Sequence, residues 1–436
     1  MSNGRMVTFK SVEVLDVLMH VLRELFSPLT GNLRVLILSL LIWSFFEQMI
    51  LTYEPLYVFA LGGSGLVLGF ITSLQTLLGS VLRILGGYVA DTRGRRLLIG
   101  WVTVVSSFGY LAHVFATNWV WLLFGVSLTS LLTLSEPAVE AIKADSVKPD
   151  QRGRGFVLFN NLPQIPALIA PALGGLFIVD ISAKMGIDLT NTRIAYFLLF
   201  LSMLSAGIIR LLFLEETLRD RRNEGDVSDL HMVRVAYRSV LENADFRRLV
   251  ILTGIFMFLF HFDDRIRSVY VVEIKKLTTV EWGKVLSISQ IASIMAVFAI
   301  GWIIDRYGRK SVFLVSLVAL GLSSFLTTVA TDHLSFVAVI SLRLICLKTR
   351  MVALQALMAD FIPSKLRGRF FGVVNISSSV GTSASVLISG ILYDLNPQVP
   401  FYFSTIAHLL AALLAQKYLQ ESGSESSDSA SSMHQD

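Results

Sequence analysis

The chain has 436 residues, of which 54% are hydrophobic and only 16% charged, with a mean hydropathy of +0.66. Soluble globular proteins carry about 25% charged residues, so this composition excludes an ordinary soluble domain, and its apolar content excludes a disordered or fibrous chain. The single cysteine, Cys346, excludes an intramolecular disulfide and a cysteine-based metal site. The net charge of +5 bears on loop topology in a membrane chain, and we expect no nucleic-acid partner.

The non-membrane parts of the chain are short. An amphipathic stretch at residues 10–27 lies in a predicted cytoplasmic N-terminal segment, 1–33, which shows no secretory cleavage site. A similar stretch at 230–246 lies in a predicted central cytoplasmic loop, 215–248. Both stretches suit helices in the headgroup plane or helices packed on cytoplasmic loops. The serine-rich tail, 419–436, is predicted to be disordered.

Twelve apolar stretches are each close to the length of about 20 residues that crosses a bilayer. They predict an all-α membrane protein with two six-helix halves, 34–214 and 249–418. The predicted spans are 34–57, 64–90, 97–116, 119–141, 156–179, 194–214, 249–272, 282–304, 311–330, 334–358, 370–393 and 401–418.

The distribution of basic residues predicts the orientation of these spans. If the N-terminus is cytoplasmic, the loops on that side hold 25 lysines and arginines, whereas the loops on the other side hold five. Cytoplasmic loops are enriched in basic residues, so we expect a multi-pass protein of the cell membrane with both termini in the cytoplasm.

Self-similarity between the halves is the strongest signal in the sequence. A Gly-x-x-x-Asp-x-x-Gly-Arg-Arg/Lys loop follows span two and recurs after span eight, at an offset of 214 residues. Its residues are Gly87, Asp91, Gly94, Arg95 and Arg96, repeated as Gly301, Asp305, Gly308, Arg309 and Lys310. We expect the first glycine to permit close helix packing, the second to permit a tight turn, and the aspartate to accept hydrogen bonds from a helix N-terminus or pair with an arginine.

The duplicated loop resembles the signature of the major facilitator superfamily, and the resemblance covers nearly the whole chain. It implies a twelve-helix secondary transporter whose two parallel halves are related by an axis along the membrane normal. It also implies that the loops gate the cytoplasmic face, so that Asp91 and Asp305 act as conformational switches; the alternative is a role in topology alone.

Span five contains Ala170-Pro171-Ala172-Leu173-Gly174-Gly175, which is similar to the Gly-Pro-x-x-Gly-Gly motif of proton-coupled drug antiporters in that family. It departs from the motif, because Ala170 replaces the first glycine. The arginine that such antiporters usually carry early in span four is also absent. A kinked, closely packed helix is therefore the favoured interpretation of this segment, ahead of an antiporter signature.

Ionisable residues at bilayer depth are costly and are functional candidates. By resemblance, spans one, four, seven and ten line a central cavity, and the charges fall on these spans. The candidates for substrate or proton contact are Glu47, Gln48, Thr133, Glu136, Glu140, His261, Asp264, Arg265, Arg343, Lys348 and Arg350. Thr129, Thr133, Glu136 and Glu140 are spaced to share one helix face, His261 and Asp264 can form a titrating pair, and Glu54, Glu140 and Arg267 near span ends can instead reach the interface.

These features predict a transporter and no enzyme. The chain contains no phosphate-binding Gly-x-x-x-x-Gly-Lys-Ser/Thr loop, no nucleophile elbow and no metal-spaced histidine or cysteine cluster, so we expect no ATP drive, cofactor or metal. Three functions remain open: proton-coupled efflux of drugs or metabolites, uptake or exchange of an anionic organic solute, and a transporter-like receptor or lipid-handling protein. We expect a monomer in the lipid bilayer whose partners are a small-molecule substrate and H⁺.

Overall fold

The structure is a computed structural model that describes residues 26–27, 29–148, 151–177, 190–218, 244–361 and 367–419. Within these ranges the only regular elements are helices, and nine of them are long and apolar enough to cross a membrane. The predicted amphipathic stretches lie almost entirely outside the described residues, as does the serine-rich tail beyond residue 419.

Six helical passes form the N-terminal half. They are, in order, α2 (Gly31–Leu51) continued by α3 (Glu54–Ala60); α4 (Gly65–Arg93); α5 (Arg96–Val114); α6 (Trp119–Ser130), η1 (Leu131–Ser135) and α7 (Glu136–Ser146); α8 (Arg152–Asn161), α9 (Gln164–Ala167) and α10 (Ala170–Phe177); and α11 (Thr190–Phe213).

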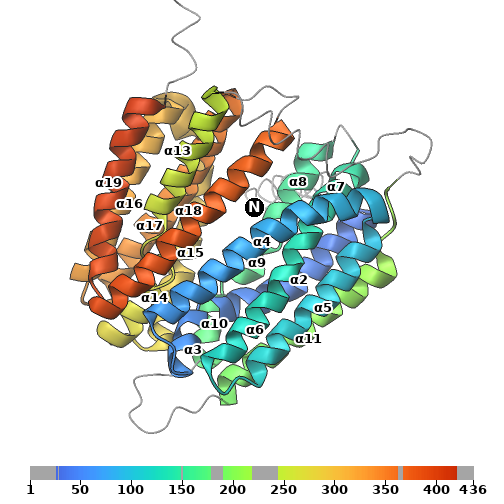
Figure 1. The fold of residues 1–436 in the computed structure, drawn as a ribbon, viewed down its shortest axis with the longest axis horizontal. Helices are drawn as coiled ribbons and strands as arrows, with labels where there is room; N and C mark the ends of the chain where they lie inside the picture. Colours follow the sequence, from blue (N-terminus) through green and yellow to red (C-terminus); the bar gives the residue numbers. More distant parts are fainter. Residues whose placement is uncertain are drawn as a thin grey trace, which may run out of the picture.

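Six further passes form the C-terminal half. They are α13 (Ala244–Phe260), α14 (Arg267–Val269) and the π-helical η3 (Tyr270–Ile274); α15 (Thr279–Tyr307); α16 (Arg309–Val329); α17 (His333–Phe361); α18 (Arg367–Leu395); and α19 (Val399–Tyr418). Figure 1 shows the two halves as two bundles side by side, which confirms the predicted fold class.

Four spans predicted as continuous helices are broken. Span one is interrupted at residues 52–53, between α2 and α3. Span four tightens to a 3-10 turn at η1, where Pro137 follows and cannot donate a backbone hydrogen bond. Span five is interrupted around Pro163 and again before Ala170, as its prolines predict. Span seven leaves the helix at residues 261–266, the segment that contains its two aspartates. Broken helices at membrane depth occur where the segment is buried in protein or lines a cavity.

Lipid-facing and core residues separate along the passes. Large apolar side chains such as Trp101, Phe108 and Phe124 are exposed on the outside, as a hydrocarbon environment allows. The main core cluster contains Tyr53, Tyr57 and Tyr196 together with residues of both halves. The apolar exterior and packed interior are therefore those of a chain that spans a membrane.

The two halves contact each other near one end of the bundle. We call this end, where α2 ends and α4 begins, the opposite face, and we call the end where α2 begins and α19 ends the terminal face. At the opposite face, Ser73 donates to the Ser383 carbonyl (2.6 Å) and Ser383 donates back to the Ser73 carbonyl (3.2 Å). Figure 1 shows α4 and α18 crossing near the opposite face and diverging toward the terminal face.

A second contact between the halves joins α10 to α15. Tyr53 donates its hydroxyl hydrogen to the Pro171 carbonyl (2.6 Å) and lies 3.2 Å from the Thr279 carbonyl. Gly174 packs on the backbone of Met49 and Gly175 on that of Thr279, which is the close packing predicted for span five. Both inter-half contacts therefore hold the opposite face together.

Candidate functional site

A cavity lies inside the N-terminal half and encloses about 140 Å³. Pockets for drug-sized ligands measure roughly 300–1,000 Å³, so this cavity suits a few water molecules or a small ion rather than a large solute. Its lining residues are Glu47, Leu51, Glu54, Gln75, Tyr110, His113, Val126, Thr129, Ser130, Leu132 and Thr133. Of these, Glu47 and Thr133 are candidates that the sequence predicts, whereas Gln48, which is also predicted, is not among the lining residues.

Glu47 is the carboxylate of this cavity that has no basic partner in the described part of the chain, whereas Glu54 pairs with Arg265. Within the described residues Glu47 forms neither an ion pair nor a hydrogen bond. Nearby, His113 is buried with Nδ1 2.8 Å from the Gly109 carbonyl oxygen. Since a carbonyl only accepts, Nδ1 carries the proton, and Nε2 of the neutral ring is the acceptor. Sequence reasoning missed His113 and Gln75 because they lie on spans three and two, outside the four spans searched.

The predicted single face of span four is not formed. Thr129 and Thr133 reach the cavity, but Glu136 pairs with Arg83 of α4, and both of these side chains are nearly half exposed. Glu140 pairs with Lys143 at 2.5 Å and is itself exposed. The physical reason is the 3-10 turn at η1, whose three residues per turn rotate the following residues away from the cavity.

The C-terminal half contains a buried network of ion pairs around Asp263. Asp263 is fully buried and binds Arg267 of the same pass and, at 3.0 Å, Arg343 of α17. Arg343 also binds Asp264, and Arg267 donates to Thr327 Oγ1 at 2.5 Å. The sequence analysis does not single out Asp263 as a site residue. Arg267, which it places near a span end where the side chain can reach the interface, is buried. The break in α13 is what turns both aspartates inward.

This network carries an excess of positive charge. Arg267, Arg343 and Arg350 oppose Asp263 and Asp264, so 3 − 2 leaves one positive charge. The Arg350 guanidinium lies 4.1 Å from the centre of the Phe260 ring, and its Nη1 has no hydrogen-bond partner in the described part of the chain. An Arg side chain without a carboxylate partner is a candidate for binding an anion.

His261 and Lys348 lie in the same half. His261 Nδ1 is 2.8 Å from the Met257 carbonyl, so its Nε2 is the nitrogen nearest Asp264, at 3.9 Å. That separation is too long for a hydrogen bond but permits an ion pair when the imidazole is protonated. Lys348 is partly buried and forms no ion pair among the described residues.

A single ion pair joins the halves among the described residues. Arg265 Nη1 lies 3.7 Å from Glu54 Oε2, with Glu54 largely buried at the edge of the N-terminal cavity. Arg343, in contrast, pairs with aspartates of its own half. The pair between Glu54 and Arg265 adds to the contacts that close the opposite face.

The duplicated loops form the tight turns predicted for them. Gly94 has φ +93° and Gly308 has φ +83°, a region that favours glycine. The Arg95 side chain binds Asp145 at 2.5 Å, and the Arg96 side chain donates to the Leu211 carbonyl at 2.8 Å. In the second loop, Lys310 donates to the Gln416 carbonyl at 2.9 Å. The side chain of Asp305 is not among those that the structure describes, so its gating role stays a prediction. The gating role of Arg309 stays a prediction as well.

The close approach predicted at Gly87 is wrong for this conformation. A methyl group added to Gly87 or to Gly301 would meet open space, whereas one added to Gly86 would collide with the backbone of Leu134. Of these two neighbouring glycines, Gly86 is therefore the one that packs closely, and Gly87 lies where the helix surface is free. Asp91 is exposed and forms neither an ion pair nor a hydrogen bond in the described ranges.

Glu216 organises the first loop and was not found from the sequence. Its Oε2 accepts the backbone N–H groups of Arg95 (2.9 Å) and Arg96 (3.0 Å), at the start of α5, and its Oε1 accepts those of Thr217 (3.0 Å) and Leu218 (2.9 Å). Partial burial raises the pKa of this carboxyl, but the four N–H donors outweigh it and hold the pKa below its ordinary value. The sequence feature that could have drawn attention to Glu216 is the pair of adjacent glutamates just after span six, but it lies 120 residues from Arg96.

Comparisons with known proteins agree with this architecture. Residues 32–264 and 266–434 match the profile of the Major Facilitator Superfamily. An uncharacterized MFS-type transporter of Methanocaldococcus jannaschii is 21% identical over 387 residues, covering 84% of this chain and 90% of that protein. A Na⁺, Li⁺, K⁺/H⁺ antiporter of Planococcus maritimus is 31% identical over 145 residues, covering 32% of this chain and 34% of the relative. A crystal structure of the nucleoside transporter NupG superposes with a TM-score of 0.72 at 13% identity, covering 89% of this chain and all of that one.

The fold defines a multi-pass membrane protein of two six-helix halves. The chain belongs to the Major Facilitator Superfamily, whose members are transporters and not enzymes. It is thus a membrane protein that acts on a small-molecule substrate.

We expect Asp263 to be essential for the stability of the C-terminal half. Asp263→Ala leaves Arg267 and Arg343 without their shared carboxylate, which should lower the free energy of unfolding by roughly 3–5 kcal/mol. The control is Glu136→Ala, which breaks the half-exposed pair with Arg83 and should cost under about 1 kcal/mol. Unfolding in mixed micelles, followed by tryptophan fluorescence, measures both, and equal losses would contradict the assignment.

We expect the Glu216 contacts to depend on pH in one direction. Because the folded-state pKa is depressed, the carboxylate stabilises the protein above its ordinary pKa of about 4.5, and that stabilisation is lost as the pH falls through the folded-state value. Glu216→Gln should therefore lower the melting temperature at pH 7, and the difference from the parent should shrink steadily below about pH 4.5. A difference that is constant with pH would show that the charge of Glu216 contributes nothing.

Proposed function

We propose that this transporter moves a small solute in exchange for protons and that Glu47 is the residue that takes up the proton. A single observation carries the proposal: Glu47 lines an internal cavity and has no partner among the described residues. A carboxylate at membrane depth without a counter-ion is costly, and binding a proton removes that cost.

The surroundings of Glu47 support this role. The cavity is too small for a drug-sized solute but large enough for the water that carries protons. Gln75, Thr129 and His113 supply polar groups around it. The other candidate carboxylates of this half, Glu136 and Glu140, each have a basic partner, so charge loss there leaves a cation unpaired instead of relieving a lone anion.

The conformation supports alternating access. Contacts between the halves hold the opposite face together, and α4 and α18 diverge toward the terminal face (Figure 1). The excess of basic residues predicts that the terminal face is cytoplasmic. On that assignment the structure is an inward-facing state, and exchange requires a second state in which the opposite face opens.

A named relative adds weight to the coupling. The protein of Planococcus maritimus with which this chain shares a 145-residue region is an antiporter of monovalent cations and H⁺. We therefore propose that the solute and protons cross the membrane in opposite directions, and that the transporter exports a drug or metabolite from the cell. This relative covers a third of the chain, so the cavity carboxylate remains the main support.

An anionic substrate is a second candidate, and a specific observation favours it. The network in the C-terminal half has one unbalanced positive charge, and Arg350 presents a free guanidinium nitrogen. An organic carboxylate or phosphate could accept from this nitrogen and balance the charge. Uptake or exchange of an organic anion follows from that arrangement, with Glu47 still serving as the proton site.

We expect Glu47→Gln to abolish proton uptake by the purified protein. Infrared difference spectra between acidic and neutral samples report the C=O band of a carboxyl group that becomes protonated. Glu47→Gln should remove the largest buried-carboxyl component, because glutamine cannot ionise. The matched control is Glu136→Gln, which removes an acid of the same half that is paired with Arg83. If Glu136→Gln removes the band and Glu47→Gln leaves it, the coupling assignment is wrong.

We expect Arg350 to determine binding of organic anions. Benzoate and glutarate should raise the melting temperature of the parent protein, whereas ethidium, a cation, tests the efflux alternative. Arg350→Gln should reduce the apparent affinity for benzoate or glutarate, measured from this shift in melting temperature, at least tenfold. The reason is that a charged hydrogen bond contributes about 1.5–3 kcal/mol. Lys348→Gln on the same helix is the control, and an unchanged shift in Arg350→Gln would exclude this anion site.

A further inference from the structure

The first turn of α4 lacks part of its own cap. A helix N-terminus leaves four backbone N–H groups without intrahelical partners. The Ser64 side chain accepts from Val67 at 3.4 Å, and valine at that position cannot return a hydrogen bond as glutamate does in a capping box. The N–H groups of Gly65 and Leu66 therefore need acceptors from elsewhere.

Asp394 provides both acceptors from the other half of the protein. Its Oδ1 accepts the Gly65 N–H at 2.7 Å and its Oδ2 accepts the Leu66 N–H at 2.8 Å. Asp394 lies at the end of α18, 329 residues from Gly65. A carboxylate at this position also interacts favourably with the positive end of the α4 dipole. We call this pair of hydrogen bonds the Asp394 cap.

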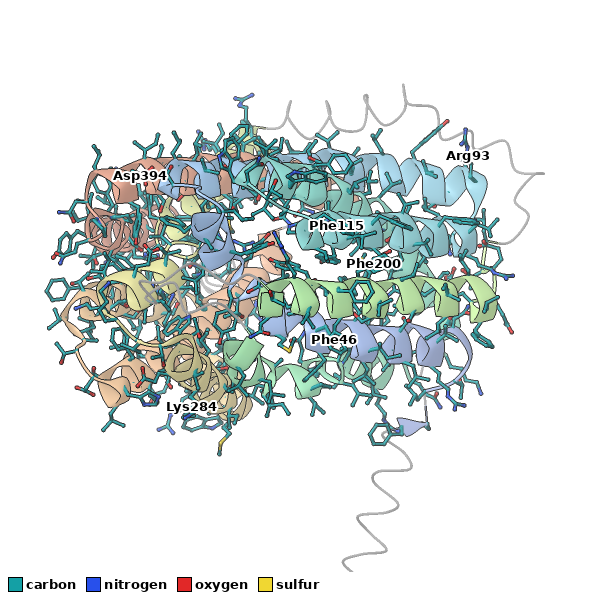
Figure 2. All side chains as sticks on the ribbon, turned by 90° about the horizontal axis from the view of Figure 1, so that it is seen from below. Phe46, Arg93, Phe115, Phe200, Lys284 and Asp394 are labelled. Carbon is teal, nitrogen blue, oxygen red and sulfur yellow. The ribbon has the colours of Figure 1, made fainter. Side chains whose placement is uncertain are left out.

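Close packing of the two helices positions the cap. The backbones of Gly65 and Gly390 approach so closely that a side chain on either would collide with the other helix. Figure 2 labels Asp394 beside the start of α4 and Arg93 at the far end of the same helix. The cap is therefore formed only while the opposite face is closed, because separation of the halves would remove the acceptor from Gly65.

The equivalent helix of the second repeat is capped differently. The N-terminus of α15 has a complete capping box, in which Thr278 accepts from Glu281 N–H and Glu281 accepts from Thr278 N–H. This cap lies within one half and does not change when the halves separate. The two repeats thus share the position of a helix start but differ in whether its cap crosses the interface.

We propose that Asp394 is a positioning residue for the transport cycle, which holds the opposite face closed by capping α4 across the two halves. The inference rests on the alternating access described above and adds the residue that sets the population of one state. The cap is formed in a structure whose helices α4 and α18 diverge toward the terminal face, so loss of the Asp394 carboxylate removes a contact that favours the closed opposite face.

The test measures the populations of the two states. Spin labels at Phe115 and Leu334, both exposed at the opposite face, report its opening, and labels at Leu97 and Tyr418 report the terminal face. All variants carry Cys346→Ala and are reconstituted in lipid nanodiscs for pulsed electron resonance. Asp394→Ala should raise the ratio of open to closed opposite face by about five- to thirty-fold, the size expected for loss of one helix cap.

Two further variants separate the inference from a general loss of capping. Asp394→Asn keeps one acceptor oxygen but loses the charge, so it should shift the ratio in the same direction by a smaller factor. Glu281→Ala removes a cap inside one half and should leave the ratio unchanged. An unchanged ratio in Asp394→Ala, or an equal shift in Glu281→Ala, would overturn the proposal.

The experiment is independent of the proton site. If Glu47→Gln retains proton uptake, the coupling proposal fails while the population shift of Asp394→Ala still supports the cap. If the opposite face opens in Asp394→Ala and the terminal-face distance does not shorten, the cap is supported and alternating access is contradicted. The reverse result, in which only the terminal-face distance changes, contradicts the cap.

Discussion

The hydrocarbon core of a bilayer offers no water, so each polar group at that depth must be satisfied by the protein itself. In the C-terminal half this requirement produces a closed network, because Asp263 binds two arginines and Arg343 binds two aspartates. The broken segment of span seven is tolerated for the same reason: Ser389 donates to the Phe262 carbonyl and Arg267 N–H to the Asp263 carbonyl. Where the requirement is not met, at Glu47, the molecule has a group whose charge state can change.

The two halves therefore share a fold but differ in how their charged side chains are paired. A lattice of ion pairs makes the C-terminal half rigid, since removing one member leaves a buried charge. The N-terminal half keeps its paired acids near the terminal face and leaves one lone acid beside a small cavity. The pair between Glu54 and Arg265 joins these two environments, because Glu54 lines the cavity while Arg265 follows the aspartates in the chain. Glu54 therefore places the cavity that contains Glu47 next to an ion pair that joins the two halves.

Much of the fold could be predicted from the sequence because its signals are local. Spans follow from apolar length, and the tight turns at Gly94 and Gly308 follow from a motif repeated at a fixed offset. The site was less predictable because its partners are distant. Nothing near Glu216 indicates the α5 N-terminus, and nothing near Asp394 indicates Gly65. The face shared by Thr133 and Glu136 failed because regular helical spacing was assumed through a 3-10 turn. For the adjacent residues Asp263 and Asp264, the sequence does not indicate which aspartate is central to the ion-pair network. That becomes clear only once the break in the helix is known.

A transporter of this kind works only if neither conformation is much more stable than the other, because a ligand shifts an equilibrium by no more than its differential affinity. Strong contacts on one face are then a liability unless similar contacts form on the other. The Asp394 cap that we propose satisfies this condition, because it consists of two hydrogen bonds at the start of one helix and can break without a large loss of stability. In our proposal, the proton taken up by Glu47 supplies the remaining free-energy difference between the two states.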